Sequence, residues 1–111
     1  MSGPEAALVD KCRVAAEAMG AFLAVVGQRN ARKSGSTLGF PDVVLVCAGQ
    51  VRLIEMKRPK QTGDSGGCLN VGQAAFIERA AEQGVKVHVV DTLSDFVELV
   101  NGCRRRSGWR V

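Results

Sequence analysis

The chain has 111 residues, of which 46% are hydrophobic and 23% charged, and its formal net charge is +4. That length accommodates one compact domain with an aliphatic core, but hardly two domains. No apolar run approaches the roughly 20 residues that span a bilayer, and the N-terminus lacks the basic region of a signal peptide. We therefore expect a soluble, cytoplasmic protein that does not associate with membranes.

The four cysteines are spread along the chain and include no C-x-x-C pair. A structural zinc site needs clustered ligands, and His88 is the only histidine that can join them. Two disulfides are possible by number, but a chain with this much apolar content does not need them. The sequence therefore predicts reduced, partly buried thiols at Cys12, Cys47, Cys68 and Cys103.

The N-terminal segment has the pattern of a helix followed by a strand. Ser2 and Glu5 have the spacing of a capping box, and apolar residues then recur at helical intervals as far as Met19. Gly20 suits the end of this helix. The short apolar run Ala21–Val26 then predicts a first strand.

Next comes a β-hairpin, predicted from the apolar runs VVLVC and VRLIEMK around a turn near residues 48–50. Alternate side chains of a strand share a face, so Glu55 and Lys57 project together. Asp42 stands at the start of the first hairpin strand, opposite the end of the second. A short turn therefore brings Asp42 close to Glu55.

Asn70 and Gln73 again have capping-box spacing and open a helix that is expected to end at Gly84. The alternating stretch Val85–Val90 predicts the fourth strand. Because a helix connects the third and fourth strands, this connection is expected to be a crossover that packs on the sheet.

A last helix is predicted to begin at the cap Thr92–Asp95, to run through about Val100 and to end at Gly102. The fold class is therefore α/β, with a small mixed β-sheet flanked by helices in the order α-β-β-β-α-β-α. We assign residues 1–103 to one domain and residues 104–111 to a basic C-terminal tail.

Positive charge is concentrated in two segments. Between Arg29 and Lys60 there are seven basic residues and two acidic ones, and residues 104–111 hold four arginines and no acid. Such an excess indicates an anionic partner, nucleic acid above all. The alternatives are solvated loops and a disordered tail. The candidate contacts are Arg29, Arg32, Lys33, Arg58, Lys60, Arg104, Arg105 and Arg106.

The two acids of the basic middle segment are Asp42 and Glu55. Two adjacent carboxylates repel each other unless a cation or a proton lies between them, and Mg²⁺ takes such oxygen ligands. Lys57 beside that ion would orient water or stabilise charge on a phosphate. Separately, Glu-x-Lys on a strand and Pro-Asp before a strand are most often structural. Their coincidence in a basic hairpin favours catalysis.

Pro41-Asp42, twelve further residues and then Glu55-Met-Lys57 resemble the signature of PD-(D/E)xK nucleases, which have a restriction-endonuclease-like core. Gly39-Phe-Pro-Asp42, Gln73 and Gly84-Val-Lys-Val-His-Val-Val90 are similar to the VRR-NUC branch of that superfamily. The resemblance extends from about Glu5 to Val100.

The resemblance implies a role for each matched residue. Asp42 and Glu55 would bind Mg²⁺ or Mn²⁺, Lys57 would be catalytic, and Gln73 would lie in the active site. The backbone carbonyl of Met56 would be a further metal ligand, and the early-helix Glu5 would join the site or serve only as a cap. Phe76 stands where the family usually has Trp, a conservative departure.

The leading hypothesis is therefore a metal-dependent, structure-selective DNA endonuclease. Stand-alone members of the resembled family act as homodimers on four-way (Holliday) junctions, and such modules are frequent in phage, which implies a bacterial or phage-infected cell. One alternative is a nickase or flap nuclease that acts with a replication or repair partner. Another is a non-catalytic nucleic-acid-binding module in which the carboxylates serve a structural ion pair.

Overall fold

The protein, seen here as a computed structural model, is described over residues 4–26, 39–57 and 69–107. Its elements alternate much as the sequence predicts, and the mixed α/β fold class is confirmed. In chain order they are α1 (Pro4–Ala18), β1 (Phe22–Val25), β2 (Val43–Cys47), β3 (Gln50–Met56), α3 (Val71–Glu82), β4 (Val87–Val90) and α4 (Leu93–Ser107).

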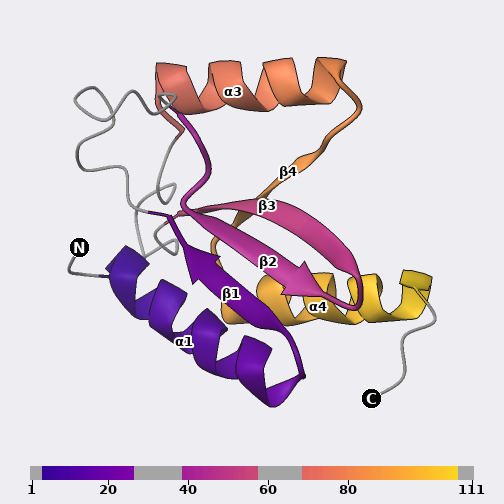
Figure 1. The fold of residues 1–111 in the computed structure, drawn as a ribbon. Helices are drawn as coiled ribbons and strands as arrows, with labels where there is room; N and C mark the ends of the chain where they lie inside the picture. Colours follow the sequence, from indigo (N-terminus) through magenta and orange to yellow (C-terminus); the bar gives the residue numbers. More distant parts are fainter. Residues whose placement is uncertain (1–3, 27–38, 58–68, 108–111) are drawn as a thin grey trace.

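The four strands form one sheet in the order β1-β2-β3-β4. The first two pairs are antiparallel and β3 pairs with β4 in parallel, so α3 is the crossover that the sequence predicts. Figure 1 shows α1 and α4 on one side of the sheet and α3 on the other. The sheet thus separates a two-helix layer from a single helix.

The hydrophobic core lies between the sheet and the layer of α1 and α4. Strand β2 shows the alternation that this requires, because Val43, Leu45 and Cys47 are buried while Val46 between them is exposed. The helices contribute residues at helical spacing, with one buried face each. These core positions are Leu8, Cys12 and Ala16 of α1 and Phe96, Val100 and Cys103 of α4.

A two-residue turn at Ala48 and Gly49 joins β2 to β3. Both residues have positive φ, 54° and 78° respectively, which matches the twist of a tight hairpin. The resulting register pairs Val43 with Ile54. Continuation of that ladder by one residue sets Asp42 against Glu55, as the hairpin pattern predicts.

Helix α4 continues beyond its predicted end, and the prediction that Gly102 stops it is wrong. Gly102 has open space around it and costs the helix only about 1 kcal/mol. Burial of Cys103 and a hydrogen bond of 2.8 Å from Arg104 Nη1 to Met19 O hold the next turn in place. The boundary predicted after residue 103 thus falls within α4, and the division of the chain there stays a prediction.

Two predicted strands are shorter in the structure than in the sequence pattern. Val85 does not join β4, because its N–H donates to Ala80 O at 2.9 Å in the turn that ends α3. Ala21 likewise precedes β1, with its N–H donated to Ala16 O at 2.8 Å. Gly20, at φ 77°, ends α1 as predicted.

The predicted free thiols are found at the three cysteines that the structure describes, Cys12, Cys47 and Cys103, which are buried and unlinked. Cys68 and the cap residue Ser2 lie outside the described residues. Across the described ranges, none of the helices combines the length and apolar character that a bilayer crossing requires.

Candidate active site

The carboxylates of Asp42 and Glu55 meet at the end of the β2–β3 hairpin. Glu55 forms a side-chain hydrogen bond with Asp42, and Asp42 Oδ2 also accepts from Met56 N at 3.2 Å. Asp42 is further fixed by its own carbonyl, which accepts from Val26 N at 2.8 Å. Backbone hydrogen bonds of two neighbouring strands therefore position the pair.

Glu55 is 1% exposed, which makes its charge costly. Burial raises the pKa of this carboxyl to about 8, and the Asp42 charge and hydrogen bond add to the shift. The neighbouring Lys57 opposes it. Without a cation, the Glu55 carboxyl therefore keeps its proton near neutral pH.

Glu5 approaches the same pair from the first turn of α1. Its carboxyl is half-buried, and its pKa is raised by burial first and by the Asp42 charge second, while Lys57 lowers it. Three carboxylates thus act electrostatically on one another around a single lysine. The predicted helix cap formed with Ser2 lies outside the described residues.

Lys57 follows β3 directly and is buried. Its N–H donates to Val90 O at 2.9 Å, a bond that belongs to the last parallel pair of β3 and β4, Met56 and Val90. Its Nζ lies 3.6 Å from Glu55 Oε1 and donates to Gln73 Oε1 at 2.8 Å. The ammonium is therefore held between the carboxylate pair and the first turn of α3.

Gln73 belongs both to the cluster of Asp42, Glu55 and Lys57 and to the cap of α3. The predicted capping box is confirmed, because Gln73 N donates to Asn70 Oδ1 at 2.8 Å and Asn70 N donates to Gln73 Oε1 at 2.9 Å. In addition, Gln73 Nε2 donates to Glu55 Oε1 at 2.5 Å. The sequence left two roles open for Gln73, as a helix cap and as a residue of the candidate site. The same side chain makes the contacts of both.

The loop that carries Asp42 packs directly on the start of α3. Gly39 has φ 83°, and a Cβ at this residue would lie 2.1 Å from Gly72 O. Next to this approach, the rings of Phe40 and Phe76 meet edge to face with centroids 5.3 Å apart. These two contacts fix the distance between Asp42 and the helix that bears the site glutamine.

For the DNA nuclease that the sequence predicts, we expect Gly39→Ala to displace α3 and to reduce cleavage at least about tenfold, since a misplacement of 1 Å can cost that much or more. Gly84→Ala is the matched control, because Gly84 has φ 82° but no atom within 4 Å of an added Cβ. Cleavage rates and melting temperatures of both variants check this. Equal rates for the two would show that the close approach to Gly72 does not matter.

The donor set fits a hard divalent cation such as Mg²⁺ or Mn²⁺. The buried carboxyl of Glu55 and the half-buried carboxyl of Asp42, which share a hydrogen bond, offer oxygen ligands to such an ion. Over residues 4–26, 39–57 and 69–107, no three Asp, Glu, His or Cys side chains are grouped so as to hold a metal. A cation here would therefore complete its shell with backbone carbonyl, water and phosphate oxygens. Met56, which directly follows Glu55, could supply the backbone carbonyl.

Most of the predicted nucleic-acid contacts lie outside the described residues, namely Arg29, Arg32, Lys33, Arg58 and Lys60. Of the C-terminal group, Arg104 donates to Met19 O and so binds α4 to the end of α1. Arg105 is exposed on the last turn of α4, and the Arg106 side chain is not described. The basic segment predicted as a tail is thus helical up to Ser107.

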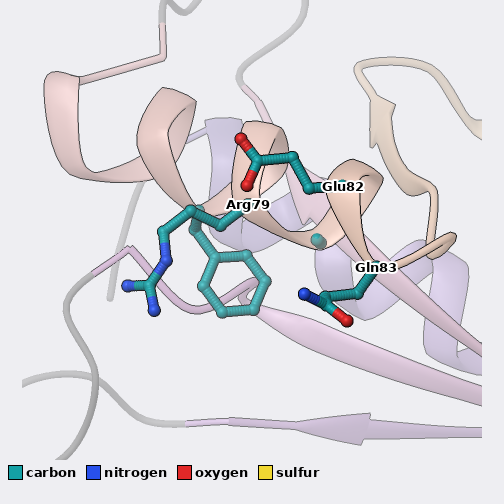
Figure 2. Close-up of a pocket in the computed structure, with 5 residues that line it drawn as sticks. Arg79, Glu82 and Gln83 are labelled. Carbon is teal, nitrogen blue, oxygen red and sulfur yellow. The ribbon is translucent and has the colours of Figure 1, made fainter.

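Sequence reasoning did not single out Arg79. This residue borders a pocket of about 440 Å³ along α3, which is lined by Phe76, Arg79, Ala80, Glu82 and Gln83. Figure 2 shows Arg79 and Gln83 extending to the same side of the helix, while Glu82 is directed away. Arg79 lies in the last turn of α3, where a positive charge is common because it suits the helix dipole. Its place in the sequence therefore does not indicate a site.

In sequence, no protein-family model and no curated protein matches the chain significantly. In structure, it is similar to a solved "VRR_NUC domain", with a TM-score of 0.65 at 20% identity over 90% of this chain and 97% of the other. A second similar structure, "VRR_NUC domain protein", gives a TM-score of 0.55 at 17% identity over 75% and 67%. The chain therefore has the fold of VRR_NUC domains.

Proposed function

We propose that the protein is a metal-dependent endodeoxyribonuclease. The observation that carries this proposal is the contact of Asp42 with the buried Glu55 carboxyl, beside the buried Lys57 ammonium. A purely structural ion pair needs one acid and one base, whereas here two acids share a hydrogen bond and Gln73 orients the base. The likeness to VRR_NUC structures supports the same function.

In the proposed reaction, Asp42 and Glu55 hold Mg²⁺ or Mn²⁺, with the Met56 carbonyl as a further ligand. Bound there, the cation supplies Lewis acidity at the scissile phosphate and makes water a stronger nucleophile. One of the three ammonium donors of Lys57 binds Gln73, so two remain. With these, Lys57 donates to the attacking water or to a phosphate oxygen. Gln73 keeps the ammonium directed at the site.

Branched DNA such as a four-way junction is the proposed substrate. A single small chain has little surface with which to bind several DNA arms, and a homodimer would present two catalytic sites. The proposed contacts with the DNA backbone are Arg105 and Arg106 together with the five candidates outside the described ranges, Arg29, Arg32, Lys33, Arg58 and Lys60. Arg79 joins them because it lies on the helix that carries Gln73.

An exposed apolar row supports the homodimer. Phe22, Val46 and Val51 are paired across β1, β2 and β3, and they are 59%, 41% and 60% exposed. They lie on the sheet face that also carries Glu55, away from the core. A two-fold contact brings a patch against its own copy, which suits a uniformly apolar row. Sedimentation as a monomer at micromolar concentration would exclude this dimer.

A substrate panel tests the proposed selectivity. In Mg²⁺ or Mn²⁺, we expect labelled four-way junctions to be cut faster than flaps, splayed arms and plain duplex. Preferred cutting of flaps or nicking of duplex would favour the alternative of a nuclease that acts with a replication or repair partner. DNA binding without cleavage of any substrate would leave only the non-catalytic binding module.

A further inference from the structure

The Gln73 amide is the point at which the catalytic cluster and the first turn of α3 are joined. Its oxygen accepts from Lys57 Nζ at 2.8 Å and from Asn70 N at 2.9 Å, and its nitrogen donates to Glu55 Oε1 at 2.5 Å. Both acceptor positions of the oxygen are thus used. The orientation of this amide decides which group faces the ammonium and which faces the carboxylate.

Asn70 fixes that orientation from outside the cluster. Its Oδ1 accepts from Gln73 N at 2.8 Å, which holds the extended backbone of Asn70 (φ −83°, ψ 174°) against the helix start. The N–H of Asn70 is then directed at the Gln73 side chain. A backbone N–H is always a donor, so it meets the amide oxygen whatever cation or substrate occupies the site.

Packing alone does not fix this end of α3. No residue of the helix is buried, whereas α1 and α4 both contribute fully buried side chains to the core. Gly72 is next to the cap, and a Cβ there would meet Asn70 Oδ1 at 3.4 Å. The cap, the close approach of Gly39 and the Phe40–Phe76 contact therefore carry the placement of the first turn.

We propose that Asn70 is a positioning residue for cleavage, which acts through Gln73 to hold Lys57 and Glu55 in register. The inference rests on the proposed nuclease function of this cluster. Asn70 is exposed, and both its side chain and its N–H bond to Gln73, so its effect on the carboxylate pair passes through the Gln73 amide. The α3 cap is thereby part of the catalytic apparatus.

Asn70→Ala and Asn70→Ser test this role, with Thr92→Ala as the matched control. Thr92 Oγ1 caps α4 by accepting from Asp95 N at 3.1 Å, away from the site. We expect Asn70→Ala to lower kcat about 10- to 100-fold with KM changed less than about twofold. Asn70→Ser retains a capping oxygen and should restore most of the rate. Thr92→Ala should lower Tm comparably and leave kcat within about twofold.

The side-chain ¹⁵N–¹H signal of Gln73, recorded without metal or DNA, gives a readout independent of cleavage. It should shift or broaden in Asn70→Ala and stay unchanged in Thr92→Ala. Equal kcat losses in these two variants, or an unmoved Gln73 signal, would overturn the inference. If wild-type protein cuts no DNA while the Gln73 signal still moves, the nuclease proposal fails and the link from Asn70 to Gln73 stands.

Discussion

Replacing Lys57 by alanine is expected to lower the rate of DNA cleavage by about 10²–10³-fold, the usual cost of removing one preorganised donor that stabilises a transition state. The ammonium is buried, 2.8 Å from Gln73 Oε1 and 3.6 Å from Glu55 Oε1. No other basic side chain lies in the described part of this cluster, so none can take over the role of the Lys57 ammonium. The measurement is single-turnover cleavage of a labelled junction in Mg²⁺ or Mn²⁺.

Binding should survive the same substitution, because Lys57 contributes its charge inside the site and not to an exposed DNA-binding face. Affinity measured in Ca²⁺, in place of the catalytic ion, should change less than about threefold. Lys86→Ala is the matched control, since it removes the same charge from an exposed position. Cleavage at the wild-type rate by Lys57→Ala, or an equal loss in Lys86→Ala, would contradict a catalytic role for Lys57.

The second large effect is on stability against pH in metal-free protein. Glu55 titrates near 4.5 in the unfolded chain and at about 8 when folded. Between these values the folded state retains a proton that the unfolded chain has lost, so stability falls as pH rises. Below 4.5 both states are protonated and no penalty exists. We therefore expect Tm in chelator to fall from pH 5 to pH 8.5.

Glu55→Gln should remove this dependence and raise Tm at pH 8.5. Each pKa unit corresponds to about 1.4 kcal/mol, and each kcal/mol to about 4–8 °C for a domain of this size. Glu98→Gln, at an exposed position of α4, is the control and should follow wild type. Wild-type protein as stable at pH 8.5 as at pH 5 would show that burial and Asp42 do not raise the pKa of Glu55.

Addition of Mn²⁺ at pH 8.5 should restore the stability that wild type loses there, because a cation would neutralise the charge that Glu55 carries once its proton is lost. Glu55→Gln should gain much less, since one ligand is neutral. The same substitution should abolish cleavage. A variant that is more stable but inactive is expected if the buried charge of Glu55 destabilises the metal-free fold and is needed for metal binding.

Local patterns predicted the parts of the site that depend on few residues. The two-residue turn at Ala48 and Gly49 sets the hairpin register, and the register alone brings Asp42 to Glu55. Capping chemistry at Asn70 and Thr92 likewise marks the helix starts at α3 and α4. Such signals act within a few residues, which is why the sequence reveals them.

Contacts between distant segments could not be predicted in this way. The approach of Gly39 to Gly72 depends on how α3 returns over the sheet, and no local pattern specifies it. The capping spacing of Gln73 predicted one partner, whereas the structure gives it three. The preference of glycine for helix ends predicted that α4 stops at Gly102, but burial of Cys103 outweighs that local preference.

Metal-dependent cleavage is the most direct test of the central claim, that Asp42, Glu55, Lys57 and Gln73 form a nuclease site. A labelled four-way junction is incubated with the full chain in Mn²⁺, in Mg²⁺ and in excess EDTA. We predict cleavage with either metal, none in EDTA and none by Glu55→Gln under any condition. Cleavage that persists in EDTA or in Glu55→Gln would contradict the account, as would a wild-type protein that binds the junction and never cuts it.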